Sequence, residues 1–270
     1  MTLQILISTY GNRIANVPNV LMSPTTNVTY IVSWQKEFSS NYGRIPQSLL
    51  DRKDVMVIET NERGGAFNRN NCINHADADI CLVADDDLRY EPNAFEKIIS
   101  IFEENTNIDI ALFQYSSDCE KRIYPPKRIN LKNKISGYSP VAFEIAFRKS
   151  SVKGKLQFNE LFGINAPELD SGEDDVFIFE ALKMGLVCEF FPITITKHIG
   201  PTTINSRSDN PKVLMARGAY LYLAYRTTMY LRAIRISQLL SQNKKSGFFH
   251  SLKYLIKGIL YIKDNYHKKQ

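Results

Sequence analysis

The chain has 270 residues, of which 44% are hydrophobic and 23% are charged, and this is enough apolar material for one large domain or for a domain with a small appendage. Its four cysteines are scattered without a CxxC pair, which excludes a disulfide scaffold and a zinc site of the usual spacing. The formal charge of +6 is unevenly distributed: residues 1–200 hold 21 basic and 26 acidic side chains, whereas residues 201–270 hold 13 and 2. We therefore expect the two parts to meet different partners.

The elements of the first 200 residues alternate between short apolar runs and helical patterns. Strands are expected at 3–8, 28–34, 54–60, 79–84, 108–116 and 141–150, and helices at 66–76, 93–104 and 174–185. Between them, residues 120–134 are polar and contain prolines, which predicts a surface loop, and Pro192 is expected to break the apolar run 186–195 into a pair of strands. Strands that alternate with helices predict a mainly parallel α/β sheet.

The basic C-terminal part contains two helical patterns, at 214–240 and 247–266. In the second pattern one face is apolar and another carries Lys253 and Lys257. The apolar face consists of Phe248, Leu252, Leu255, Ile256 and Ile259. Two interpretations stay open: helices that pack on the sheet, or a helix that lies on an anionic membrane. No nucleic-acid reading module is recognisable, so we expect no nucleic-acid partner.

The N-terminal residues and the overall hydropathy bear on where the protein works. MTLQILISTY lacks the basic start and the long apolar stretch of a signal peptide, and no run of about 18 apolar residues could span a bilayer. We therefore expect a cytoplasmic protein, with peripheral attachment to the inner face of the plasma membrane as the alternative that the basic helices raise.

Three consecutive aspartates, Asp85 to Asp87, directly follow a predicted strand. Adjacent carboxylates repel one another, so the cluster is either a solvated acidic turn or a site that binds a cation. In open α/β sheets ligands bind beyond the carboxyl ends of the strands, where the segment STYGNRI (8–14) is expected as a polar loop. Mg²⁺ or Mn²⁺ held by carboxylates and substrate phosphates would suit this edge. The fingerprints GxGxxG and GxxxxGK[ST] are both absent, which argues against a nicotinamide enzyme and a P-loop NTPase.

A second acidic group, Glu173 and Asp174, opens the predicted helix in GEDDVFIFEALKMG (172–185). Acidic residues in a first turn commonly offset the helix dipole, and this explanation is sufficient by itself. Together with the aspartate cluster, however, a carboxylate here could accept a proton from an incoming hydroxyl.

The ordered set of motifs resembles the bacterial family-2 glycosyltransferases, which have the GT-A fold. The resemblance extends over about residues 1–205 and is carried by ILISTYGNRI, ERGGAFNRN, ICLVADDDLRYEP, FEIAFRK, GEDDVFIFEALKMG and TKHIGPTT. It implies a catalytic domain at 1–205, built on a mainly parallel nucleotide-binding sheet with helices on both faces. The basic helices then form a C-terminal extension at 206–270.

The resemblance also implies roles for individual residues. In the DxD motif, Asp85 would approach the ribose and Asp87 would hold Mn²⁺ or Mg²⁺, joined by His198, for which a purely structural hydrogen bond is an equal alternative. Asp174 would be the general base, with Glu173 as its substitute. The nucleotide pocket would be lined by Thr9, Tyr10, Arg13, Arg69, Asp85 and Asp86; for Arg69 a place on a helix surface is the alternative.

The implied reaction is the inverting transfer of a sugar from a nucleotide-diphosphate donor to a glycan or lipid-linked acceptor in surface polysaccharide biosynthesis. One departure concerns the nucleobase: many members have an acidic pair after the second strand, whereas this chain has SWQKEF (33–38). Two alternatives remain, a nucleotidyltransferase that makes sugar nucleotides and a scaffold that binds them without turnover.

Overall fold

The fold was analysed in a computed structural model, which describes residues 1–36, 43–133, 138–200 and 207–266. Contacts divide the chain into two compact units. The first comprises residues 1–63, 67–158 and 177–200, and the second comprises 64–66, 159–176 and 201–270. Residues 37–38 of SWQKEF, residues 201–203 of TKHIGPTT and the expected domain boundary at 205 lie outside the described residues.

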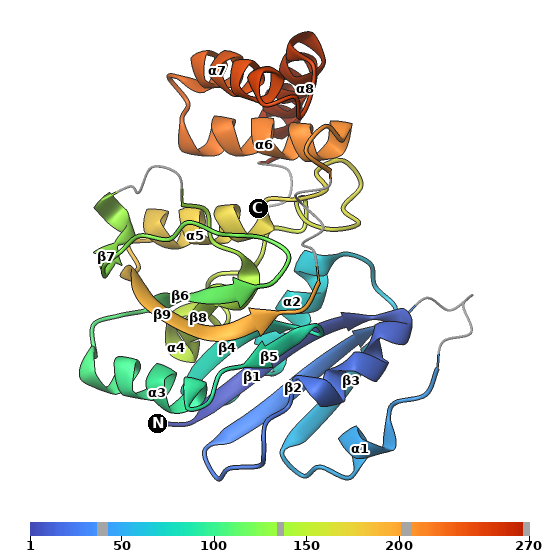
Figure 1. The fold of residues 1–270 in the computed structure, drawn as a ribbon, viewed down its shortest axis with the longest axis vertical. Helices are drawn as coiled ribbons and strands as arrows, with labels where there is room; N and C mark the ends of the chain where they lie inside the picture. Colours follow the sequence, from blue (N-terminus) through green and yellow to red (C-terminus); the bar gives the residue numbers. More distant parts are fainter. Residues whose placement is uncertain (37–42, 134–137, 201–206, 267–270) are drawn as a thin grey trace. The chain divides into compact units, whose positions relative to one another are not determined.

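The first unit contains a mixed, mainly parallel sheet in the order β3-β2-β1-β4-β8-β6-β9-β5, with β7 paired to β9 (Figure 1). Its strands are β1 Leu3–Tyr10, β2 Val28–Gln35, β3 Val55–Thr60, β4 Ile80–Asp85, β5 Leu88–Tyr90, β6 Ile110–Ser117, β7 Ile129–Asn130, β8 Ile145–Arg148 and β9 Cys188–His198. The helical segments are η1 Gly11–Asn19, α1 Gln47–Leu50, α2 Gly65–His75, α3 Ala94–Glu104, η2 Leu131–Asn133, η3 Ala142–Glu144, α4 Lys149–Val152 and α5 Glu173–Lys183. The first residues of α2 and α5 are grouped with the second unit.

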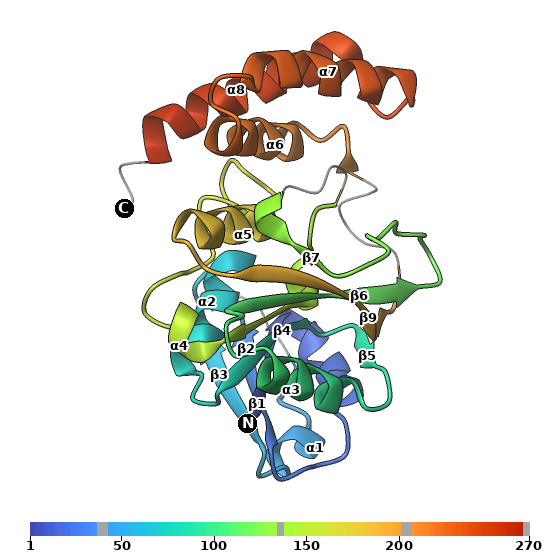
Figure 2. The same cartoon turned by 90° about the vertical axis from the view of Figure 1, so that its left-hand side faces the viewer.

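Side-chain alternation along the strands fills both faces of this sheet. Leu3, Ile5 and Ile7 of β1 share a buried cluster with the apolar face of α3. On the other face, Phe147 of β8 contacts Phe177 of α5, with ring centroids 6.4 Å apart. Figure 2 shows α3 beside the strands. The prediction of a mainly parallel α/β sheet with helices on both faces is confirmed.

The predicted break at Pro192 is wrong, because β9 is one strand from Cys188 to His198. Its parallel pairing with β6 shifts register there: Leu112 pairs with Phe190, but Gln114 pairs with Thr194. A bulge in β9 therefore accommodates the proline, which has no N–H to donate to the ladder. The segment 8–14 also differs from the expected loop, since β1 continues to Tyr10 and η1 follows directly.

The described part of the basic C-terminal segment, residues 207–266, contains three helices where two were predicted. They are α6 Pro211–Ala224, α7 Met229–Gln242 and α8 Phe248–Asn265. The expected helix at 214–240 is interrupted between α6 and α7, where Thr227 and Thr228 are adjacent β-branched residues with low helix propensity. Leu255 and Ile259 of α8 are fully buried in a cluster with Ala216 and Ala219 of α6.

α6 and α8 cross with their backbones in contact. A Cβ atom added to Gly218 would lie 2.0 Å from the carbonyl oxygen of Leu255, and one added to Gly258 would lie 1.9 Å from that of Met215. Only glycine fits at these two positions, so the sequence fixes how closely these helices approach.

Candidate active site

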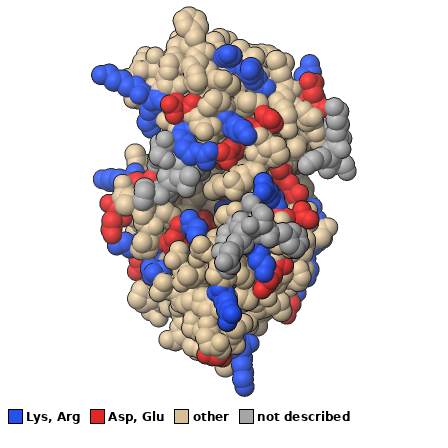
Figure 3. All heavy atoms as spheres, turned by 90° about the vertical axis from the view of Figure 1, so that its right-hand side faces the viewer, with Lys and Arg blue, Asp and Glu red and all other residues tan. Residues whose placement is uncertain are grey.

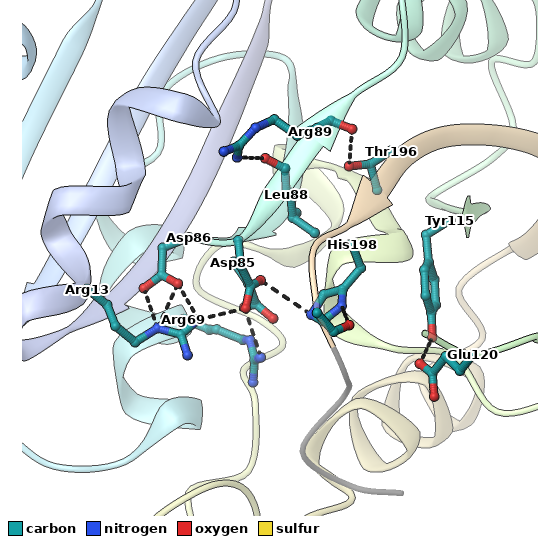
Figure 4. Close-up of polar contacts among 12 residues, drawn as sticks. Arg13, Arg69, Asp85, Asp86, Leu88, Arg89, Tyr115, Glu120, Thr196 and His198 are labelled. Atoms are coloured by element: carbon teal, nitrogen blue, oxygen red, sulfur yellow. Dashed lines mark hydrogen bonds and ion pairs between the residues drawn. The ribbon is translucent and has the colours of Figure 1, made fainter. Parts of the chain in front are cut away.

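The acidic triplet lies at the carboxyl edge of the sheet. Asp85 ends β4 and pairs in register with Ser8 of the neighbouring parallel strand β1, and Asp86 and Asp87 form the turn that leads into β5. His198 is the last residue of β9 and pairs with Leu88 of β5. The sheet topology therefore brings the triplet and His198 together, as Figure 4 shows.

Asp86 is bound by residues that follow from the first strand. Its carboxylate is 2% exposed and accepts hydrogen bonds from Thr9 Oγ1 at 2.5 Å and from Arg13 Nε at 2.8 Å, as well as from Arg13 Nη2. Burial raises the pKa of Asp86, and the bonds from Arg13 and Thr9 only partly offset this effect. Asp86, which follows β4, is thus bonded to β1 through Thr9, and its carboxylate is paired with Arg13 of the same protein.

Asp87 and His198 lie close together, and the two atoms that face each other, Asp87 Oδ1 and His198 Nε2, are both hydrogen-bond acceptors when the ring is neutral. His198 Nδ1 lies 3.0 Å from the carbonyl oxygen of Gly200, which can only accept, so this nitrogen carries the proton. In the neutral ring, the lone pair of Nε2 then faces Asp87 Oδ1 at 3.5 Å. This buried oxygen has no hydrogen-bond donor among the described residues, so either a proton or a cation would relieve the pair.

The pKa shifts of this pair agree with their mutual attraction. When His198 is protonated, its Nε2–H faces Asp87, and this attraction raises the pKa of His198 more than burial lowers it. Burial alone would raise the pKa of Asp87, but its interactions with His198 and Arg13 outweigh burial and lower it. Asp87 Oδ2 accepts a hydrogen bond from Arg13 Nη2 at 2.7 Å, so one guanidinium serves both Asp86 and Asp87.

Asp85 is approached by Arg69 of α2, at 3.3 Å between Oδ1 and Nη2. Arg69 is 8% exposed, and its guanidinium lies 5.6 Å from the ring centroid of Phe158. Burial raises the pKa of Asp85 although Arg69 opposes it. In Figure 4, Arg13 and Arg69 reach the aspartates from one side and His198 lies on the other. Arg69 is therefore at the site and not on a helix surface.

The other predicted nucleotide-pocket residues lie at the end of β1. Thr9 is buried and Tyr10 is 37% exposed. The sequence did not indicate Asn68, whose buried amide donates a hydrogen bond to the carbonyl oxygen of Thr9 at 3.0 Å. Asn68 precedes Arg69 in the segment ERGGAFNRN, which was the available signal.

A cavity of about 320 Å³ borders Asp86 and Asp87 and contains further residues that the sequence did not indicate. It is lined by Arg13, Asn16, Asn19, Asp86, Asp87, Arg89 and Ile199. The first three are spaced by three residues in η1, a spacing that aligns side chains along one edge of a 3₁₀ helix. Because η1 was expected as a loop, this alignment could not be foreseen.

The second acidic pair opens α5 and belongs to the second unit. Glu173 is 5% exposed and its carboxylate packs against Gly163, at a place where an added Cβ would lie 3.1 Å from Glu173 Cδ. Asp174 is only partly buried. Of the two candidates for a base, Asp174 is therefore the more accessible.

Comparison with known proteins gives a family match for part of the chain. Residues 40–164 match the family model described as glycosyl transferase family 2, which confirms the resemblance drawn from the motifs. No curated protein matches the chain.

Solved structures of similar fold include TarS of S. aureus. One TarS crystal structure has a TM-score of 0.59 at 15% identity, and the match covers 89% of this chain but only 44% of TarS. For TarS 1–349 in complex with UDP the TM-score is 0.60 at 13% identity, and for the complex with UDP-GlcNAc it is 0.59 at 13%. These two matches cover 100% of this chain and 92% and 93% of the other. At such identities the likeness establishes the fold.

Proposed function

We propose that the chain, whose residues 40–164 match the family model of glycosyl transferase family 2, transfers a sugar from a nucleoside-diphosphate donor to a hydroxyl of a glycan or lipid-linked acceptor. We assign the reaction to surface polysaccharide biosynthesis in the cytoplasm. The observation that supports this most is the Asp87–His198 pair at the carboxyl edge of the sheet, where open α/β sheets bind their ligands. The TarS structures with UDP and UDP-GlcNAc support a nucleotide-sugar donor.

The donor set fits Mn²⁺ or Mg²⁺. Among the described residues no group of three or more His, Cys, Asp or Glu side chains could hold a metal ion, but these ions commonly use one or two carboxylates and take further ligands from substrate phosphates. Asp87 and His198 would hold the ion, and the proton on Nδ1 of His198 is fixed by Gly200 as in many metal-ligating histidines. When bound, the ion would neutralise the charge of the diphosphate leaving group.

The remaining steps fall to side chains of the chain itself. Arg69 and Asp85 form one border of the site, and Arg13 keeps Asp86 and Asp87 in place. We assign the proton acceptor to Asp174, which would take the proton of the acceptor hydroxyl as it attacks the anomeric carbon. A single direct displacement of this kind inverts the configuration at that carbon.

The test is a transfer assay with radiolabelled UDP-, GDP-, CDP- and dTDP-sugars, with Mn²⁺ or with EDTA, and with glycan and lipid-linked extracts as acceptors. A transferase moves label to an acceptor or slowly to water, whereas a binding scaffold retains the donor intact. Asp87→Ala should lower metal-dependent turnover by about 10²-fold or more, and Asp51→Ala, at an exposed aspartate directly after α1, serves as the matched control. Full metal-dependent turnover in Asp87→Ala would remove Asp87 from this role.

Peripheral binding to an anionic membrane is part of this proposal, but we now assign it to a different face of α8 from the one predicted from the sequence. The stripe predicted on α8 includes Leu255 and Ile259, which are buried. The opposite face of α8 exposes Phe249 (82%) and Leu260 (47%), and the intervening Lys253 and Lys257 are also exposed. Figure 3 shows one face of the molecule, on which basic side chains lie among acidic and uncharged ones. Among the described residues, no helix is both long and apolar enough to cross a bilayer.

The membrane surface is tested by co-sedimentation with vesicles that contain anionic lipid. Each basic residue near such a surface contributes about 1 kcal/mol, so Lys253→Glu with Lys257→Glu should release the protein in a salt-dependent way. Reversal of Lys36, which is remote in sequence and belongs to the first unit, is the control. If the unmodified protein stays in the supernatant at low salt, where attraction is strongest, the surface does not bind membrane.

A further inference from the structure

A second cavity, of about 420 Å³, lies at the carboxyl end of β6 and is lined by residues 114–122 and 124. β6 runs parallel to β9, and its last residue, Ser117, pairs with His198. The cavity therefore lies at the same edge of the sheet as the aspartate triplet, and it belongs entirely to the first unit.

One wall of the cavity belongs to a partly buried cluster of aromatic rings around Arg122. Its guanidinium lies 5.5 Å from the ring centroid of Tyr115, 5.4 Å from that of Tyr124 and 5.7 Å from that of Tyr138. Glu144, which is 0% exposed, pairs with Arg122 Nε at 3.4 Å and accepts hydrogen bonds from Tyr124 and Tyr138. The charge of Arg122 is thus compensated inside the protein, and the tyrosines are held in fixed positions.

The lining offers polar groups without a net charge. Asp118 pairs with Lys197 at 2.7 Å, and Glu120 accepts a hydrogen bond from Tyr115 at 2.8 Å. With Arg122 compensated by Glu144 and Asp118 by Lys197, the charges of Glu120 and Lys121 remain and cancel. The lining also includes one amide and two serine hydroxyls. Such a surface suits a neutral ligand with many hydroxyl groups better than an anion.

The cavity is connected to the aspartate site through His198. The ring of Tyr115 lies edge-on to that of His198, with centroids 6.2 Å apart, and Phe143 stacks on His198 at 5.5 Å. In Figure 4, His198 lies between the aspartates and Tyr115, whose hydroxyl points to Glu120. Tyr115 thus borders the cavity on one side and the partner of Asp87 on the other.

We propose that this cavity binds the acceptor of the reaction through a neutral, polyhydroxylated sugar unit, with Tyr115 separating it from the donor side at His198. The inference rests on the proposed transferase function. The cluster of Arg122 and Glu144 would act as a positioning element that holds the tyrosine wall in place.

The chain provides a chemical probe of this cavity. Cys119 lines it and is exposed, whereas the thiols of Cys72, Cys81 and Cys188 are buried, and burial raises the pKa of each to about 12. A maleimide should therefore react at Cys119 alone, because the thiolate is the nucleophile. The Cys119→Ser variant is the matched control.

The first measurement is the rate of maleimide reaction in the presence of methyl glycosides of glucose, galactose and N-acetylglucosamine. At least one should slow the reaction about twofold or more once its concentration reaches its Kd, and inorganic phosphate should not. Protection by phosphate but by none of the glycosides would overturn the proposal, as would equal rates under all conditions. This readout needs no turnover, so it can succeed or fail independently of the transferase assignment.

The second measurement compares acceptor and donor kinetics after modification of Cys119. The bulky adduct should raise the KM for the acceptor extract several-fold while slow hydrolysis of the donor sugar persists, and Cys119→Ser should be insensitive to the reagent. Unchanged acceptor kinetics after complete modification would contradict the proposal. Ser116→Trp, which places a large side chain in the lining without a reagent, should give the same pattern. Loss of donor hydrolysis in unmodified protein would instead count against the transferase function itself.

Discussion

Replacement of Gly218 by alanine tests how closely α6 and α8 approach each other. In most helices this change is favourable by about 0.8–1.0 kcal/mol, because alanine has the higher helix propensity. Here the new Cβ would lie 2.0 Å from the carbonyl oxygen of Leu255. Ordinary contact begins near 3.4 Å, so the helices would have to separate by 1.4 Å at the crossing.

The expected cost exceeds the gain. Overpacking of a core costs about 1–3 kcal/mol, and the upper end applies because a backbone carbonyl cannot rotate away as a side chain can. After the gain in propensity is subtracted, we expect a net destabilisation of about 2 kcal/mol. For a chain of this size this corresponds to a decrease in Tm of about 4–8 °C, if it unfolds cooperatively.

The assay is urea denaturation together with thermal unfolding followed by circular dichroism. Gln238→Ala, at an exposed position of α7, is the control for a helix substitution without a close neighbour. Gly258→Ala should have the same sign, and the double variant should cost less than the sum, since both changes relieve the same crossing. A Gly218→Ala protein that is as stable as the original, or more stable, would refute the backbone contact.

Three further predictions concern the first unit and the base. Asp174→Asn should lower transfer by about 10²-fold or more with little change in donor binding, and an active variant would leave Asp174 as an acidic residue of the first helical turn. Asp86→Asn removes the charge that Thr9 and Arg13 bond, so the free energy of unfolding in urea should fall by about 2 kcal/mol; an unchanged value would contradict the link between β1 and β4. The hydrogen bond from Arg52 lowers the pKa of Asp54 below its ordinary value, so the stabilisation is present above that ordinary pKa and is lost as pH falls through the folded pKa. Asp54→Asn should therefore destabilise the protein at pH 6 but not below the folded pKa, and a constant difference in unfolding free energy at all pH values would exclude this linkage.

The strands of the first unit were predictable because their local signal is strong. Runs rich in valine and isoleucine, bounded by polar segments, predicted both ends of β1 to β4 to within two residues. β5 was missed since it has only three residues, Leu88–Tyr90, and its pairing partner lies in β9. The proline in β9 was misjudged because a local rule cannot foresee that a bulge will accommodate it.

For the candidate site, the sequence indicated which residues lie close together but not which hydrogen bonds and ion pairs each of them makes. The aspartate triplet and His198 are distant in sequence; the resemblance grouped Asp87 with His198, and the structure places them 3.5 Å apart. That Asp86 is bonded by Thr9 and Arg13 depends on the register of β1 against β4. The cavity beside Tyr115 was not indicated by any motif, since most of its lining comes from a loop in which Arg122, partly buried, pairs with the buried Glu144 of a distant segment.

The strand order has a consequence for how the protein is made. His198 reaches the site only when β9 pairs with β6 and with β5, and the partners Leu88 and His198 are separated by more than a hundred residues of chain. Such non-local pairing forms slowly, because a long loop must close before any contact rewards it. During synthesis β1 to β4 can pair as soon as they emerge. The edge of β4 then stays unpaired until β8 has been synthesised. β9 is the last strand of the sheet to be synthesised, so an unfinished chain contains the aspartate triplet before His198 can lie beside it.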